Sequence, residues 1–196
     1  MADPLGRAIR SIAKYPGSVL AKTGITPNQL TVAGFLFNGI VAYFIAMGRF
    51  GFIPTGILIL IAGFFDALDG SVARVTGKVT AFGDFLDSVI DRYSDSVIYF
   101  GILAHFLRSG RTEYVITAVA AIIGSLVVSY TRAKAESLGQ KCEVGLLPRT
   151  VRIIILGGCF CVGQVFWGLL MIAILSHLTV LQRIIYVHNN LRNKPC

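Results

Sequence analysis

Long apolar runs, broken by short polar or glycine-containing segments, dominate this sequence. A helix needs about 20 mostly apolar residues to cross a bilayer, and most of these runs reach that length. The pattern predicts six membrane helices, at residues 26–47, 52–75, 80–107, 113–137, 148–163 and 165–189. The turn between the last two is placed at Gly163–Gln164. The predicted fold is all-α: a polytopic membrane protein whose six-helix bundle covers residues 27–189.

A short amphipathic segment precedes the first apolar run. Leu5, Ile9 and Ile12 fall on one face of a helix, whereas Arg7, Arg10 and Lys14 fall on the others. We expect residues 1–17 to form a juxtamembrane helix that lies on the membrane surface and ends at Pro16–Gly17. The whole chain, residues 1–196, then forms a single membrane domain.

Charge indicates how the bundle is oriented. The net charge is +8, and 55% of the residues are hydrophobic, which favours anionic lipid head groups over nucleic acid as the basic surface's partner. Of the 18 Lys and Arg residues, only Arg49, Arg108 and Arg111 lie in the first–second and third–fourth loops. The positive-inside rule therefore predicts a cell-membrane protein with both termini on the cytoplasmic side.

Carboxylates gather where the second and third helices meet on that same side. Six of the ten acidic residues lie there: Asp66, Asp69, Asp84, Asp87, Asp91 and Asp95. Asp66 and Asp69 share one helix face by their i, i+3 spacing, as Asp87 and Asp91 do by i, i+4. Carboxylates so close together need a cation between them, and oxygen-only ligands favour Mg²⁺. The spacing suits two such ions, with Mn²⁺ as an alternative.

The small and basic residues between these acids complete a recognisable signature. It reads Asp66-x2-Asp69-Gly70-x2-Ala73-Arg74-x8-Gly83-x3-Asp87-x3-Asp91. This pattern resembles the CDP-alcohol phosphotransferase family. The resemblance implies an enzyme that cleaves CDP-diacylglycerol, transfers its phosphatidyl group to an alcohol and releases CMP. It also implies metal ligation by Asp66, Asp69, Asp87 and Asp91, with Asp91 as general base, and a homodimer.

A second set of residues is expected to bind the CDP donor. Gly70 and Ala73 leave room for a ligand beside the first aspartate pair, and Arg74 offers a bidentate fork for phosphate. Small residues of this kind also serve helix packing. The resemblance adds Thr80 and, after the capping sequence Thr26-Pro27, the residues Asn28, Gln29 and Thr31, which could equally act only as a helix cap.

Basic residues in the second half point to an acceptor that carries phosphate. They are Arg132, Lys134, Arg149, Arg152 and Arg183, and we assign the acceptor phosphate to Arg132, Lys134, Arg152 and Arg183. SYTRAKAESLG, residues 145–152 and TVLQR resemble phosphatidylinositol-phosphate synthases, which use inositol phosphate. Arg132 and Lys134 stand in reversed order, and Pro148 and Val151 replace glutamates of that subfamily.

Alternatives remain open at this point. Glycerol phosphate as acceptor would make the protein a phosphatidylglycerophosphate synthase. More distantly, a divalent-cation transporter would also place acids within a membrane, but it predicts carboxylates spread through membrane depth. Asp84 and Asp95 fall outside the signature; we expect structural roles for them, with Asp95 paired to Arg92.

Overall fold

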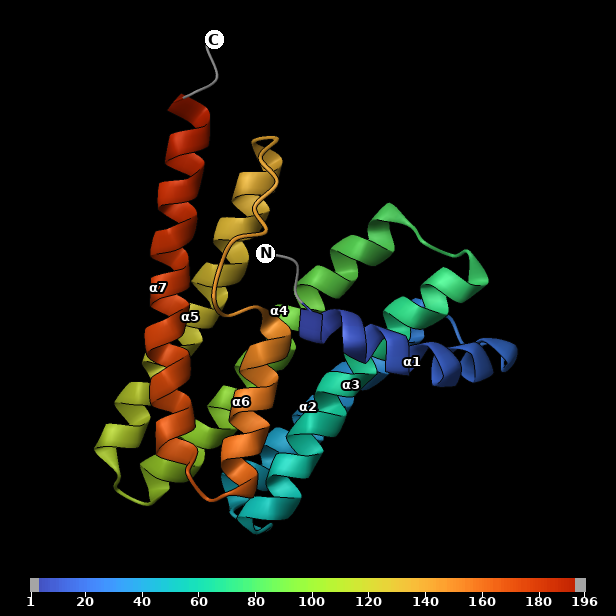
Figure 1. Cartoon of the computed structure of the whole chain (residues 1–196). Helices are drawn as coiled ribbons and strands as arrows, with labels where there is room; N and C mark the ends of the chain where they lie inside the picture. Colours follow the sequence, from blue (N-terminus) through green and yellow to red (C-terminus); the bar gives the residue numbers. More distant parts are fainter. Residues whose placement is uncertain (1–3, 193–196) are drawn as a thin grey trace.

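The computed structural model describes residues 4–192, which form seven α-helices joined by short turns, apart from a longer loop at residues 138–148 (Figure 1). Residues 1–3 and 193–196, parts of the predicted surface helix and of the single domain, lie outside this description. The helices are α1 (Pro4–Lys22), α2 (Pro27–Met47), α3 (Phe52–Thr76), α4 (Ala81–Arg108), α5 (Thr112–Ser137), α6 (Arg149–Cys161) and α7 (Val165–Arg192). The all-helical prediction is confirmed.

Two threonines fix the helix starts nearest the acidic residues. The Thr26 hydroxyl accepts a hydrogen bond from the Gln29 backbone N–H at 3.3 Å, and the Gln29 side chain accepts one from the Thr26 N–H at 2.9 Å. This reciprocal pair is the predicted capping box, with Pro27 at the first helical position. Likewise, the Thr80 hydroxyl accepts from the Gly83 N–H at 3.0 Å and starts α4.

Helix α1 differs from its prediction. It does not end at Pro16–Gly17 but continues to Lys22, with Pro16 inside the helix. The reason is packing against α3: a Cβ on Gly17 would lie 2.5 Å from Oγ of Ser71, so only glycine permits this approach. Buried Ala13 joins a small core with residues of α2 and α3, which holds the helix in place. The structure does not describe the side chains of Arg7 and Arg10.

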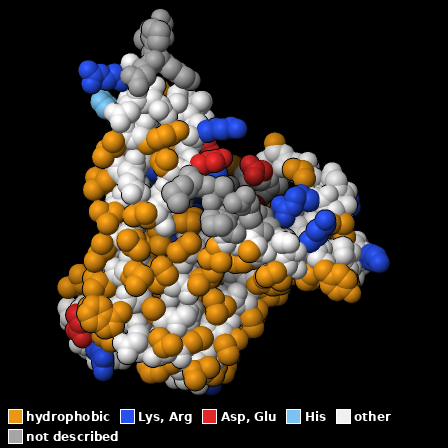
Figure 2. All heavy atoms as spheres, viewed as in Figure 1, with side chains coloured by type: hydrophobic (Ala, Val, Ile, Leu, Met, Phe, Trp, Pro, Cys, Tyr) orange, Lys and Arg blue, Asp and Glu red, His pale blue; other side chains and the backbone are white. Residues whose placement is uncertain are grey.

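Four of the seven described helices, α2, α3, α5 and α7, are long and apolar enough to cross a membrane. The remaining two bundle helices depart from that pattern for different reasons. Helix α4 carries four aspartates, Asp84, Asp87, Asp91 and Asp95, between its start and its middle. Helix α6 has 13 residues, a length of about 20 Å. Exposed hydrophobic side chains cover much of the bundle surface (Figure 2). The structure therefore supports a membrane protein, without establishing all six predicted spans.

The main core lies between α2, α3, α4, α5, α6 and α7, around the fully buried Ile102, Leu169 and Ile172. Close helix contacts depend on glycine, as in many membrane bundles. A Cβ on Gly101 of α4 would lie 2.5 Å from the Ala42 carbonyl oxygen of α2. Helix α6 packs along α3, with Ile153 beside Gly63 and Arg149 beside Asp66, and α1 packs mainly against α3 (Figure 1).

Candidate active site

Three signature aspartates converge where α3 ends and α4 begins. Asp66 and Asp69 come from the last three turns of α3, and Asp87 comes from the second turn of α4. One ligand oxygen from each lies within 4.8 Å of the others. Oδ1 of Asp87 is buried and has no hydrogen-bond partner among the described residues. An all-oxygen cluster with an unpartnered buried carboxylate oxygen fits a hard divalent cation.

Asp69 is held in place through both of its carboxylate oxygens. It is 4% exposed, and its two oxygens accept hydrogen bonds from different groups. The Thr31 hydroxyl of α2 donates to Oδ2 at 2.8 Å, and the Gly70 backbone N–H donates to Oδ1 at 2.5 Å. Thr31 thus supports a candidate metal ligand, because partners of this kind orient the carboxylates that coordinate ions.

Asp91 faces a cation supplied by the chain itself. Nη1 of Arg149, the first residue of α6, lies 2.8 Å from Oδ1 of Asp91 and 2.5 Å from Oδ2 of Asp66. Within residues 4–192, the carboxylates close enough together to share a metal ion are those of Asp66, Asp69 and Asp87. Asp91 lies outside this group and forms an ion pair with Arg149. Its assignments as metal ligand and general base remain predictions.

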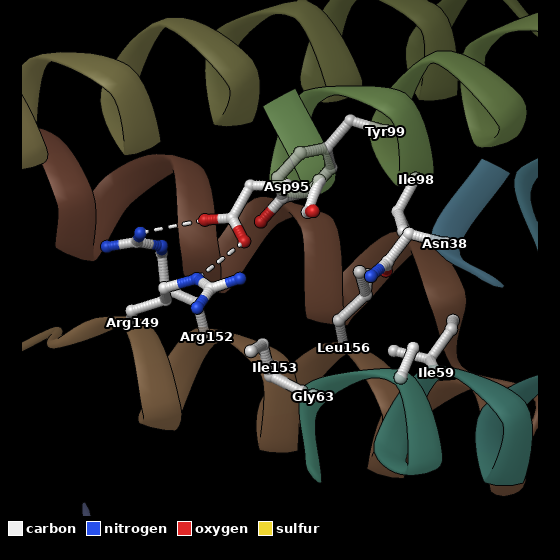
Figure 3. Close-up of a pocket in the computed structure, with 12 residues that line it drawn as sticks. Asn38, Ile59, Gly63, Asp95, Ile98, Tyr99, Arg149, Arg152, Ile153 and Leu156 are labelled. Atoms are coloured by element: carbon white, nitrogen blue, oxygen red, sulfur yellow. Dashed lines mark hydrogen bonds and ion pairs between the residues drawn. The ribbon is translucent and has the colours of Figure 1, made fainter. Parts of the chain in front are cut away.

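The predicted partner of Asp95 is wrong. Asp95 binds Arg149 and Arg152 on α6, not Arg92: Nε of Arg149 donates to Oδ1 at 3.0 Å, and Nη2 of Arg152 donates to Oδ2 at 2.9 Å (Figure 3). The Arg92 guanidinium instead donates to the Ser88 carbonyl. One sequence signal was available, since Asp95 continues the i, i+4 series of Asp87 and Asp91 along one helix face.

A cavity of about 240 Å³ opens between the starts of α2 and α4 and the end of α3. Six of the seven predicted donor-binding residues line it: Asn28, Thr31, Gly70, Ala73, Arg74 and Thr80. Gln29 serves in the capping box. Lys78, which the sequence did not single out as a site residue, also lines this cavity and adds a second cation beside Arg74.

A larger cavity of about 460 Å³ lies between α1, α3 and α6. Its lining combines charged residues of the aspartate cluster with large apolar residues, among them Ile9, Ile12, Leu60, Phe64 and Ile153. The two cavities share Asp69, Gly70, Arg74 and Asp87. The aspartate cluster therefore stands where a cavity lined by many polar residues meets a cavity that also has large aliphatic and aromatic residues in its lining.

The four predicted acceptor residues divide into two kinds. Arg152 and Arg183 are buried and donate to backbone carbonyls of the α5–α6 loop: Arg152 to Leu147 at 3.3 Å and Arg183 to Val144 at 2.9 Å. Arg132 and Lys134 are exposed near the end of α5, where Arg132 pairs with Glu136 at 2.9 Å. A phosphate-binding role for these four remains a prediction.

Comparison with known proteins agrees with this geometry. The sequence model for CDP-alcohol phosphatidyltransferases matches residues 24–181. The chain belongs to this family. The enzyme is 42% identical over 182 residues to an archaetidylinositol phosphate synthase of Pyrococcus horikoshii, covering 90% of this chain and 93% of that one. It is 34% identical over 181 residues to a phosphatidylinositol phosphate synthase of Mycobacteroides abscessus, covering 85% and 79%.

Solved structures show the same relationship. The phosphatidylinositol phosphate synthase of Mycobacterium tuberculosis with CDP-DAG bound superposes with a TM-score of 0.78 at 29% identity, covering 92% of this chain and 94% of that one. The same mycobacterial enzyme in complex with manganese and citrate gives a TM-score of 0.80 at 28% identity, covering 89% and 88%. The predicted family is confirmed, and the chain is a phospholipid-synthesising transferase.

Proposed function

We propose that this enzyme transfers the phosphatidyl group of CDP-diacylglycerol to inositol phosphate, producing phosphatidylinositol phosphate and CMP with Mg²⁺ as cofactor. The observation that carries the proposal is the junction of the two cavities at Asp69, Gly70, Arg74 and Asp87. A CDP-lipid has the matching shape, because its diphosphate joins a polar nucleotide to apolar chains. The mycobacterial enzyme was solved with CDP-DAG bound, which supports a CDP-lipid as the donor.

The chain's own residues suit in-line substitution at phosphorus. Asp66, Asp69 and Asp87 would hold the Mg²⁺, which when bound offsets the charge of the diphosphate. Arg74 presents a fork to the phosphate oxygens, and Asp91 accepts the proton of the attacking hydroxyl. The new P–O bond forms to the acceptor alcohol while the P–O bond to CMP breaks. We assign both ions of a two-metal site to the four signature aspartates.

The acceptor is assigned from the basic residues together with the relatives. Relatives at 42% and 34% identity carry the names archaetidylinositol phosphate synthase and phosphatidylinositol phosphate synthase. A phosphorylated acceptor suits Arg132, Lys134, Arg152 and Arg183. The archaetidyl relative also makes a CDP-linked archaetidyl lipid a donor worth testing beside CDP-diacylglycerol. Glycerol phosphate is the alternative acceptor.

The proposed setting is a cell membrane crossed by six helices, with the active site and both termini in the cytoplasm, and a homodimer as the assembly. The uneven distribution of Lys and Arg supports this orientation. In a cysteine-free background, a cysteine at Lys78 should react with an impermeant maleimide only from the cytoplasmic side. A cysteine at Arg49 should react only from the opposite side. Light scattering of the purified protein would measure the assembly.

The deciding experiment measures CMP release by the purified protein in detergent. Each reaction contains Mg²⁺, one donor and one acceptor chosen from inositol phosphate, glycerol phosphate, inositol and serine. We expect release with inositol phosphate, loss of release on EDTA treatment, and recovery on adding Mg²⁺. Release with glycerol phosphate alone would contradict the acceptor while keeping the reaction. Absence of release with every pair would contradict the proposed function.

A further inference from the structure

Arg149 contacts two of the four signature aspartates, Asp66 and Asp91, through a single nitrogen atom. Its Nη1 atom contacts carboxylate oxygens of Asp66 on α3 and Asp91 on α4 at 2.5 and 2.8 Å. Its side chain is 20% exposed, so solvent screens these contacts only in part. The guanidinium thus supplies positive charge at two of the four residues assigned to divalent cations.

A second ion pair, with Asp95, fixes the position of the Arg149 side chain. Asp95 accepts a hydrogen bond from its Nε atom, and the other oxygen of Asp95 accepts one from Arg152 (Figure 3). Arg152 has a side chain only 3% exposed and also donates to the Leu147 carbonyl. Asp95 therefore joins Arg149 to a buried, immobilised neighbour, which limits the directions in which the guanidinium can point.

We propose that Arg149, positioned by Asp95, competes with divalent cations for Asp66 and Asp91 and thereby lowers the ion affinity of the aspartate cluster. Asp66 belongs both to the three-carboxylate group and to the ion pair with Arg149. A divalent cation bound to Asp66 must therefore share that carboxylate with the guanidinium or displace it. Like charges at this separation repel, and the partly buried setting strengthens the repulsion.

Arg149 and a divalent cation would therefore occupy the aspartates in turn. Before an ion binds, Arg149 neutralises part of the negative charge that would otherwise separate α3 from α4. A divalent cation held by Asp66 or Asp91 would compete with the Nη1 atom of Arg149 for the same carboxylate. The inference rests on the proposed function, since it requires that the aspartates bind divalent cations.

The first test measures Mn²⁺ binding without donor or acceptor, by electron paramagnetic resonance of the free ion. The variants are R149Q, which removes the charge, R149K, which keeps it, and R49Q as a control at an exposed arginine far along the chain. We expect R149Q to bind Mn²⁺ about tenfold more tightly than the wild type. R149K and R49Q should stay within about threefold of the wild type.

A second test uses only the wild-type protein, so it holds even if R149Q fails to fold. Phenylglyoxal modifies free guanidinium groups, and mass spectrometry of the peptides quantifies the modified fraction at each arginine. We expect Mg²⁺ to increase modification of Arg149 severalfold and to leave Arg49 unchanged. Increased modification supports displacement, whereas unchanged or decreased modification of Arg149 overturns it.

The outcomes separate this inference from the proposed function. Equal or weaker Mn²⁺ affinity in folded R149Q would overturn the competition while leaving the transferase proposal in place. Absence of Mn²⁺ binding by the wild type would overturn the metal site itself, and the inference with it. If the wild-type protein binds Mn²⁺ but releases no CMP, the proposed reaction is contradicted. The competition between Arg149 and the divalent cation is then still supported.

Discussion

The hydroxyl of Thr31 donates a hydrogen bond of 2.8 Å to Oδ2 of Asp69, linking α2 to α3 across 38 residues of sequence. Both side chains are nearly buried, at 8% and 4% exposure. The contact ties a residue predicted to bind nucleotide to a carboxylate predicted to bind metal. Thr31 therefore acts at least in part through Asp69, and its replacement should change metal dependence.

Replacing Thr31 with valine removes this donor at nearly constant volume. We expect T31V to need about tenfold more Mg²⁺ for half-maximal CMP release, because an unsupported carboxylate is less well oriented for the ion. T31S keeps a hydroxyl and should remain close to the wild type. A Mg²⁺ titration of all three proteins checks this. An unchanged Mg²⁺ requirement in T31V would show that the hydrogen bond does not serve the metal site.

Replacing Asp91 with asparagine tests the assignment of the general base. We expect D91N to lose about 10²- to 10⁴-fold in the rate of CMP release, the usual contribution of general-base catalysis. E113Q, at an exposed acid in the first turn of α5, serves as the control for losing one carboxylate. Transfer by D91N at the wild-type rate would contradict the base assignment.

Replacing Gly101 with alanine tests the contact between α2 and α4. The added Cβ would lie 2.5 Å from a backbone oxygen of Ala42. The helices must then separate, and we expect a loss of about 1–3 kcal/mol in the free energy of unfolding. G39A is the matched control, because a Cβ at Gly39 meets nothing within 4 Å. Thermal unfolding in detergent should show a lower Tm for G101A alone.

Replacing Arg152 or Arg183 with alanine tests the acceptor assignment. We expect each variant to raise the KM for inositol phosphate about tenfold, since each lost charge-assisted hydrogen bond weakens phosphate binding. In R183A, which lies outside the Asp95–Arg149 network, the KM for the CDP-lipid should stay within about twofold. R192A, at an exposed arginine ending α7, is the control. A KM for inositol phosphate that does not change would place the acceptor site elsewhere.

Local sequence was sufficient for much of this protein. The capping residues Thr26 and Thr80 start α2 and α4 at the predicted positions because a cap depends only on neighbouring residues. The spacing of Asp66, Asp69 and Asp87 predicted their convergence, since i, i+3 positions share a helix face and the connecting turn is short. The family followed from the same residues.

Tertiary packing decided what local rules could not. Helix α1 passes through Pro16 because Gly17 packs against Ser71 of α3, a contact that no neighbouring residue specifies. Asp95 does not pair with the nearby Arg92. It binds Arg149 and Arg152, which lie 54 and 57 residues away in the sequence. Spacing along one helix predicts a shared face, but the choice among several arginines depends on how α4 and α6 pack. Long, flexible guanidinium side chains can reach partners from distant elements, and only the assembled bundle determines which carboxylate each one meets.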